Sequence, residues 1–228
     1  MSEHNMSGQK PVIAVIGGTG DLGTGLVFRW VRAGYHVIIG SRKAESAIEA
    51  AAAMKARLPN AQVEGLENSA AAVKADIVCM TVPFSHQQDT LAVIHSAVQG
   101  KIFIDVTVSL KPPKVGTVQL PPEGSAGVIA QKTLGENVRV VSAFQNIAAA
   151  HLNDEHDIHC DVLVTGDDID AREVVVQLAQ AAGMKAWHAG PIANSAATEA
   201  LTSVLITLNK RYKIEGGAGI QITGTPGV

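Results

Sequence analysis

The sequence predicts a doubly wound α/β fold with a mostly parallel sheet and an additional C-terminal helical segment. Short apolar runs rich in β-branched residues alternate with longer segments of helical period, which is the pattern of βαβ units around a parallel sheet. No repeat of fixed period and no long linker interrupts this alternation. The chain has 228 residues, of which 46% are hydrophobic, so it is long enough to bury a full core.

Six apolar runs are predicted strands, because each is short and ends in small, polar or proline residues, as strand ends beside a ligand crevice often do. They cover residues 12–16, 36–39, 77–82, 101–106, 138–143 and 162–165. Helical periodicity predicts helices over 23–33, 44–57, 89–98 and 171–182, each followed by a turn or breaker residue.

A last helix is expected over 194–212, before the glycine-rich tail 215–228. The tail would be mobile, or would close over a site or a partner subunit. Residues 110–127 carry four prolines and little periodicity, so they predict a long loop. Such a loop is either functional or a tolerated surface insertion.

Composition argues against several classes of partner. The formal charge is −3, from 18 basic and 21 acidic residues. The protein is therefore not expected to have the strongly positive electrostatic field that would attract nucleic acid or an anionic membrane. No apolar run reaches the roughly 18 residues of a membrane span, and the polar leader 1–10 lacks the apolar centre of a signal peptide and should be a frayed end. The expected partner is a small molecule.

Only two cysteines occur, Cys79 and Cys160, far apart in the sequence. They cannot build a disulfide framework or a zinc-binding CxxC pair, so a cytoplasmic location is the simplest expectation. The segment 151–160 gathers histidines, acids and Cys160, but its spacing matches no standard metal signature. A solvated loop is favoured there over a metal site, and no metal ligand is predicted.

The glycine-rich turn Gly18-x-Gly20-x-x-Gly23 follows the first strand and opens the first helix, which is the context of a dinucleotide fingerprint. We expect Gly18 to permit the tight turn, Gly20 to let the backbone approach a pyrophosphate, and Gly23 to let the helix pack on the strand. The helix N-terminus supplies amides and partial positive charge, and Thr19 adds a hydroxyl donor. The predicted fold is therefore of the Rossmann type.

The residues after the second strand predict NADP rather than NAD. An NAD enzyme usually carries an acidic residue there, whereas this chain has Ser41, Arg42 and Lys43. The planar guanidinium of Arg42 could clasp a 2′-phosphate, with Ser41 donating beside it. Cations are otherwise unfavourable at a helix N-terminus, although a solvated helix start is the alternative.

Two further segments are expected to line the cofactor crevice. Val82, Pro83 and His86 follow the third predicted strand and should lie over the cofactor, unless Pro83 only ends the strand and His86 is only a surface residue. The segment 143–150 is small and apolar, and hydride transfer needs two rings to approach to about 3–3.5 Å with little water present. The alternative for 143–150 is a packed strand-to-helix corner.

Within that segment, we expect Ile147 to press one ring into place, and Gln145 and Asn146 to orient a hydride acceptor by hydrogen bonds. A deazaflavin acceptor would need position and polarity rather than a protein acid. A carbonyl or imine acceptor would need a proton donor, for which His86, His151 and His188 are available.

The motifs GGTGDLGTGL, GSR, VVSAFQNIAAA and AGPIANS resemble those of the reductases that pass hydride between NADP and the deazaflavin coenzyme F420. The resemblance runs from about residue 12 to residue 209. It implies NADP contacts by the residues Thr19, Gly20, Asp21, Leu22, Ser41, Arg42, Val82, His86 and Ala149.

The acceptor half of the resemblance is weaker. Where that family places a histidine, an arginine and a serine around the deazaflavin, this chain has Gln145, Ala196 and Ala200, while Thr202 is retained. The resemblance and the apolar last helix also imply a homodimer.

The sequence therefore predicts an NADP-binding Rossmann-type domain over 11–190, and a C-terminal helix and tail over 191–228 that complete the acceptor site or a dimer interface. The first functional hypothesis is hydride transfer between NADPH and coenzyme F420. The alternatives are an NADPH-dependent reductase of a flavin or of a small carbonyl or imine compound, and an NADPH-binding sensor without turnover.

Overall fold

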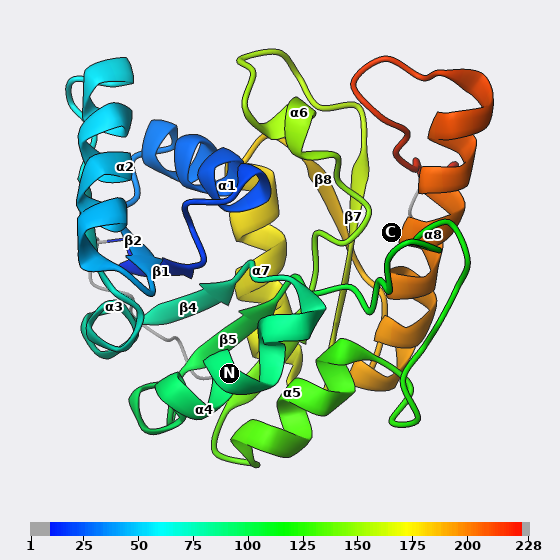
Figure 1. Ribbon diagram of the computed structural model, residues 1–228, viewed down its shortest axis with the longest axis horizontal. Helices are drawn as coiled ribbons and strands as arrows, with labels where there is room; N and C mark the ends of the chain where they lie inside the picture. Colours follow the sequence, from blue (N-terminus) through cyan, green and yellow to red (C-terminus); the bar gives the residue numbers. More distant parts are fainter. Residues whose placement is uncertain (1–9, 225–228) are drawn as a thin grey trace.

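Eight strands form one sheet in the order β3-β2-β1-β4-β5-β6-β7-β8 in the computed structural model, which describes residues 10–224 (Figure 1). All neighbouring pairs are parallel except β6 and β7, which are antiparallel. The strands are β1 (Ile13–Ile16), β2 (Val37–Ser41), β3 (Val63–Glu67), β4 (Ile77–Met80), β5 (Ile102–Asp105), β6 (Arg139–Ser142), β7 (Asp161–Gly166) and β8 (Lys185–His188). The doubly wound, mostly parallel fold is confirmed.

Helices cover both faces of the sheet (Figure 1). The helices are α1 (Asp21–Arg32), α2 (Ala44–Arg57), α3 (Asn68–Lys74), α4 (Gln87–Ile94), α5 (Ala126–Leu134), α6 (Ala149–Leu152), α7 (Ile169–Ala181) and α8 (Ser195–Tyr212). Alternate residues of β1 point to opposite faces: Ile13 and Val15 pack with α1, α2 and α7, whereas Ala14 and Ile16 pack with α3, α4 and α5. The strand β1 is therefore apolar throughout, because both of its faces are buried.

Two strands and three helices were not expected from the sequence. The edge strand β3 reads VEGLE and buries only its first residue, and the edge strand β8 reads KAWH and buries none, so neither carries the apolar signal of a central strand. The helices α3, α5 and α6 were also missed. The predicted loop 110–127 extends too far, because the Ser125 hydroxyl accepts from the Val128 N–H and caps α5 from residue 126 onward.

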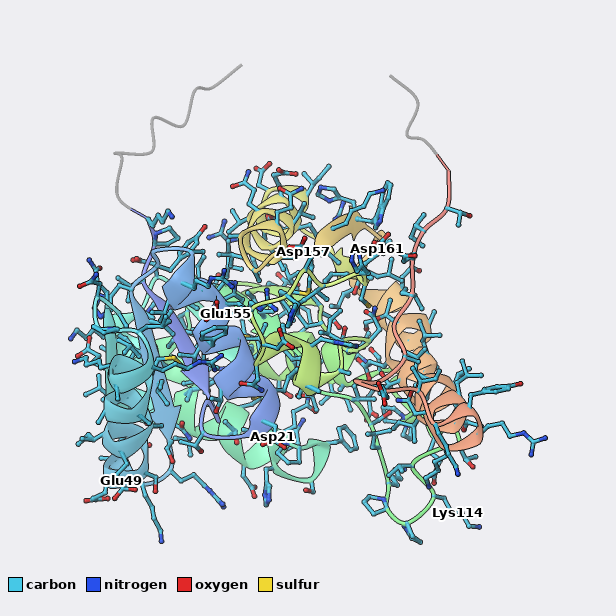
Figure 2. The ribbon with its side chains drawn as sticks, turned by 90° about the horizontal axis from the view of Figure 1, so that it is seen from above. Asp21, Glu49, Lys114, Glu155, Asp157 and Asp161 are labelled. Carbon is cyan, nitrogen blue, oxygen red and sulfur yellow. The ribbon has the colours of Figure 1, made fainter. Side chains whose placement is uncertain are left out.

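Helix α8 stands at the end of the molecule opposite α2, beside the proline-rich loop (Figure 1). The hydroxyl of Thr207 donates to the Gly116 carbonyl at 2.9 Å, and that of Ser203 donates to the Thr117 carbonyl at 3.4 Å. Figure 2 shows Lys114 at the projecting tip of this loop. The loop is thus tied to α8 by the residues that follow its tip.

The described part of the glycine-rich tail folds back onto the body of the protein. The Asp161 N–H donates to the Ile220 carbonyl at 2.8 Å, the Ile222 N–H donates to the Asp161 carboxylate at 2.9 Å, and the Gly217 carbonyl lies 3.0 Å from the His151 ring. Figure 2 shows Asp161 beside this segment. Residues 215–224 therefore pack on β7 and α6 of their own chain, an arrangement that neither expectation for the tail described. Residues 225–228 and the leader residues 1–9 lie outside the described residues.

Arg29 fixes the segment that follows α6. Its side chain is buried, and its guanidinium donates to the backbone carbonyls of His151, Leu152, Asp154 and His156 at 2.6–3.1 Å. Burial lowers the pKa of this guanidinium. One cation from α1 therefore holds the loop 151–157 by satisfying its carbonyl groups.

A buried polar network joins α8 to the sheet. The Glu199 carboxylate accepts from the N–H groups of Ala126 and Gly127 at 2.8 and 3.0 Å, at the N-terminus of α5. The Asp105 carboxylate accepts from the Gln87 amide at 2.7 Å, and that amide also donates to the Ala126 carbonyl. Two acids thus share a buried region between β5, α4, α5 and α8.

Burial raises the pKa of both carboxyl groups. The pKa of Glu199 rises to about 8, against the two N–H donors that lower it, and the pKa of Asp105 rises to about 6. The charge on each acid disfavours the charge on the other. The folded chain therefore holds protons at a pH where the unfolded chain has released them.

This proton uptake predicts a pH-dependent stability. A folded pKa raised above the ordinary 4.5 of Glu199 gives stability that is complete below about pH 4.5 and is lost as the pH rises through about 8. Urea unfolding across this range should show a free energy of unfolding that falls by about 1 to a few kcal/mol. Glu199→Gln should flatten this slope, whereas Glu136→Gln, at an exposed acid, should keep it. An unchanged slope in Glu199→Gln would contradict the prediction.

Candidate functional site

The glycine-rich turn packs so tightly that side chains are excluded at three positions. Gly17 has a φ of +75°, the left-handed conformation that glycine adopts without strain. A Cβ on Gly18 would lie 2.7 Å from the Val15 carbonyl oxygen, and one on Gly23 would lie 2.7 Å from both Gly18 Cα and Thr81 Oγ1. The left-handed residue of the turn is thus Gly17 rather than Gly18, while Gly23 allows the close packing expected of it.

Gly20 differs from its neighbours, because the space in front of it is open. A Cβ there would meet only the Gly17 oxygen, at 3.6 Å. Gly20 is also the N-cap of α1, and no side chain accepts a hydrogen bond from the first N–H groups of this 12-residue helix. Uncapped donors and the positive end of the helix therefore face an open surface, which is the arrangement that binds phosphate groups. Asp21 and Leu22 supply two of these N–H groups, and Figure 2 shows Asp21 at the start of α1.

A cavity of about 230 Å³ lies over this turn. Its lining residues are Gly17, Thr19, Gly20, Ser41, Arg42, Asn68, Thr81, Val82, Pro83, His86 and Thr90. An adjoining cavity of about 350 Å³ shares Arg42, Asn68, His86 and Thr90 with it and is completed by Glu67, Asp89 and Val93. Most of the sequence-predicted nucleotide contacts are thus brought together at the C-terminal ends of β1, β2 and β4.

The end of β2 carries the basic residues. Arg42 is exposed and lines both cavities, whereas Lys43 is the N-cap of α2 and lines neither. The Ser41 hydroxyl accepts a long hydrogen bond from the Lys43 N–H, at 3.4 Å. The guanidinium of Arg42 makes no salt bridge with the described residues, so its charge is available to an anionic ligand.

The segment after β6 holds a strained residue. Phe144 is fully buried and has a φ of +72°, a conformation that costs about 1–3 kcal/mol for a residue with a side chain. Its ring packs edge-on against Trp30 with the centroids 6.0 Å apart. The surrounding core therefore enforces the sharp turn that leads from β6 into Gln145, Asn146 and Ile147.

The side-chain amides of Gln145 and Asn146 point inward. Gln145 donates to the Ser142 hydroxyl at 2.7 Å and to the Asp105 carbonyl at 3.0 Å, and Asn146 donates to the Asp161 carbonyl at 2.7 Å. Both residues are at most 5% exposed. Their hydrogen-bond donors are thus used within the protein, so the residues fix the position of the segment, and direct contact with an acceptor stays a prediction.

The other predicted residues of the hydride site lie around the same corner. Thr202 of α8 donates to the Gln145 carbonyl at 2.8 Å, which ties α8 to this segment. Ile147 is buried, and Ala149 is partly exposed at the start of α6. Because Asn153 donates to the Asp21 carbonyl at 3.2 Å, α6 lies against the first turn of α1. Ala149 therefore lies beside the glycine-rich turn, although it does not line the cavity.

Sequence reasoning missed several residues of this site, among them Thr81, Asn68 and Thr90, and it missed the backbone conformation of Phe144. Thr81 lines the cavity and donates to the Ile16 carbonyl at 3.0 Å, which holds the ends of β1 and β4 together. Asn68 lines both cavities, but it follows an edge strand that the sequence did not reveal. No sequence signal marks the positive φ of Phe144, because only the surrounding packing imposes it.

Residues 10–224 contain neither a metal-binding cluster nor a membrane-spanning helix. No group of three or more His, Cys, Asp or Glu side chains is arranged to hold a metal ion among them. None of the helices in this part of the chain is long and apolar enough to span a membrane.

Comparison with known proteins identifies the relatives of the chain. Residues 12–109 match the model of the family described as NADP oxidoreductase coenzyme F420-dependent. The F420-dependent NADP reductase of Methanocaldococcus jannaschii is 40% identical over 92% of this chain and 97% of its own length. That of Methanothermobacter thermautotrophicus is 43% identical over 94% of this chain and 95% of its own length.

The fold agrees with these relatives. A solved structure from Arthrobacter sp. FB24 superposes with a TM-score of 0.73 over 90% of this chain and 96% of that one, at 24% identity. At that identity, the likeness supports the fold alone. The two archaeal relatives, which align along nearly their whole length, place this chain in the family of F420-dependent NADP reductases.

Proposed function

We propose that this protein transfers hydride between NADPH and the deazaflavin coenzyme F420. The observation that carries the proposal is the cavity in which an uncapped helix N-terminus and the open face of Gly20 meet Ser41 and Arg42. The family supports the choice of both coenzymes, because its members with 38–43% identity to this chain are F420-dependent NADP reductases.

The residues that line the cavity match the charges and hydrogen-bonding groups of NADP. The N–H groups at the start of α1 and the hydroxyl of Thr19 would donate to the pyrophosphate. Ser41 and Arg42 would hold the 2′-phosphate, since a guanidinium pairs with phosphate oxygens through two parallel hydrogen bonds. Val82, Pro83 and His86 would cover the opposite side of the nucleotide.

The corner between β6 and α6 would receive the nicotinamide and the acceptor ring. NADPH and F420 supply the hydride chemistry themselves, so the protein needs to place two flat rings and exclude water. The side chains of Ala148 and Ala149 are small enough to allow close approach, and Ile147 forms the buried floor behind them. Thr202 and Gln145 hold this corner in one position through the hydrogen bond between them.

The acceptor side departs from the family at Gln145, Ala196 and Ala200. The two alanines are partly exposed on α8 and offer no side-chain hydrogen bond, and the amide nitrogen of Gln145 donates to groups within the protein. These positions favour a second candidate, an NADPH-dependent reductase of a flavin or of a small carbonyl or imine compound. The two candidates share the nucleotide half and differ in the acceptor.

The acceptor is decided by NADPH oxidation followed at 340 nm, with purified F420 and with free flavin. We expect rapid oxidation with F420 and little with flavin, because the relatives that are 38–43% identical to this chain are F420-dependent NADP reductases. NADH in place of NADPH serves as the control donor and should be slow. Turnover with flavin or a carbonyl compound but not with F420 would assign the second candidate.

Arg42→Ala should weaken NADPH binding by about 1.5–3 kcal/mol, roughly 10- to 150-fold, and leave NADH binding nearly unchanged. The reason is that Arg42 would contact only the 2′-phosphate, which NADH lacks. Lys55→Ala, which removes a positive charge from the last turn of α2, the helix that follows Arg42, should change neither affinity. Titration followed by the fluorescence of the reduced nicotinamide measures the affinity of wild type and of each variant for both nucleotides. Equal losses for both nucleotides in Arg42→Ala would contradict this role.

A homodimer through α8 is part of the proposal. Val204, Leu208 and Tyr212 follow one another at helical spacing, and each is 37–68% exposed. Val118 of the neighbouring loop is also exposed, at 43%. An apolar stripe of this kind is usually covered by a partner, and a twofold axis would pair it with its own copy.

Leu208→Glu should therefore convert a dimer to a monomer, because a charge in a paired apolar stripe loses its hydration. Sedimentation velocity at several protein concentrations measures the mass. Ile169→Glu is the matched control, since Ile169 is 63% exposed on α7, away from the stripe. A wild-type protein that sediments as a monomer would refute the dimer.

A further inference from the structure

Asn68 is a buried polar residue whose hydrogen bonding is incomplete within the described part of the chain. Its side chain is only 4% exposed, and its Oδ1 atom has no hydrogen-bond partner among residues 10–224. An unpaired buried polar group of this kind costs about 1–3 kcal/mol, so native proteins rarely keep one without a use. A bound ligand is one way to complete the hydrogen bonding of this amide.

The position of Asn68 connects it to the proposed NADP site. In the parallel pairing of β2 and β3, Ser41 lies opposite Glu67, so Asn68 follows directly beside the Ser41–Arg42 pair. Its Oδ1 lies above Gly40, at 3.0 Å from where a Cβ of that glycine would stand. Asn68 lines both the cavity over the glycine turn and the adjoining cavity. The amide therefore stands over the end of β2, at the junction of the two cavities.

The chemistry of an adenosine ribose matches this position. In dinucleotide-binding folds the ribose lies over the end of β2, where NAD enzymes place a carboxylate for its hydroxyl groups. This chain has no carboxylate at Gly40, Ser41 or Arg42. A 2′-phosphate only accepts hydrogen bonds, and Ser41 and Arg42 are proposed for it. The 3′-hydroxyl still needs a partner.

A side-chain amide is suited to a hydroxyl group. Rotation of the amide exchanges Oδ1 with Nδ2, so Asn68 can present an acceptor or a donor to the cavity. A ribose hydroxyl both donates and accepts, and so it pairs with either end. A carboxylate at the same place would repel the neighbouring 2′-phosphate, which an uncharged amide does not.

We propose that Asn68 binds the 3′-hydroxyl of the adenosine ribose, so that the ribose is held by two separate devices: Ser41 and Arg42 for the phosphate, and Asn68 for the hydroxyl. This assignment rests on the proposed NADP-binding function. Arg42 would distinguish NADPH from NADH, whereas Asn68 would contact both, because the 3′-hydroxyl is common to the two nucleotides.

The test is a cycle of two proteins and two ligands. Wild type and Asn68→Leu, which has a similar volume and no polar group, are titrated with NADPH and with an NADPH analogue that lacks the 3′-hydroxyl. We expect wild type to bind the analogue about tenfold more weakly than NADPH, and Asn68→Leu to bind both ligands equally, at the weaker level. Asn60→Leu, at an exposed asparagine, should behave as wild type.

Asn68→Asp is the second variant, in case the leucine disturbs the fold. It should lose more affinity for NADPH than for NADH, because its carboxylate accepts from the hydroxyl but repels the 2′-phosphate. If wild type binds NADPH and Asn68→Leu distinguishes NADPH from the analogue as strongly as wild type does, the assignment is overturned. It is also overturned if both variants bind NADPH as tightly as wild type. Either result would leave the proposed NADP-binding function in place. A wild-type protein that fails to bind NADPH would overturn the proposed function and this assignment with it.

Discussion

The close contact between the glycine-rich turn and the end of β4 is the constraint on which the proposed nucleotide site depends. Gly23 lies against Gly18 and Thr81, and Thr81 in turn bonds to the Ile16 carbonyl. A side chain at either glycine would separate α1 from β1 and β4. The N-terminus of α1 would then no longer face the cavity. The anion-binding geometry thus follows from the absence of side chains in the glycine-rich turn rather than from an added functional group.

The other half of the proposed site depends on internal hydrogen bonds instead. Gln145, Asn146 and Thr202 direct their donors to carbonyl and hydroxyl groups of the protein, and Phe144 is held in a strained conformation between them. Such strain persists only where the surroundings over-determine a residue. The corner between β6 and α6 is therefore built to keep its shape, which suits a reaction whose main demand is the placement of two rings.

The central strands and the glycine turn could be predicted from the sequence because their signals are local. Strands buried on both faces are continuously apolar, and the fingerprint glycines stand at fixed spacing. The edge strand β3 is partly exposed at all residues but its first and carries two glutamates, so it was missed, and Asn68, which follows it, was missed with it. The inward direction of the Gln145 amide was also beyond prediction, since its partners Ser142 and Asp105 are set by tertiary packing.

The two halves are joined physically through α1. Arg29 donates to the carbonyls of the last two residues of α6, and the first turn of α1 accepts from Asn153. The helix that presents its N-terminus to the cavity thus also positions the segment proposed to receive the nicotinamide. A displacement of α1 would therefore move the proposed pyrophosphate site and the proposed nicotinamide site together. This coupling explains how the corner that follows β6, five strands after β1 in the sequence, keeps a fixed position relative to the glycine-rich turn.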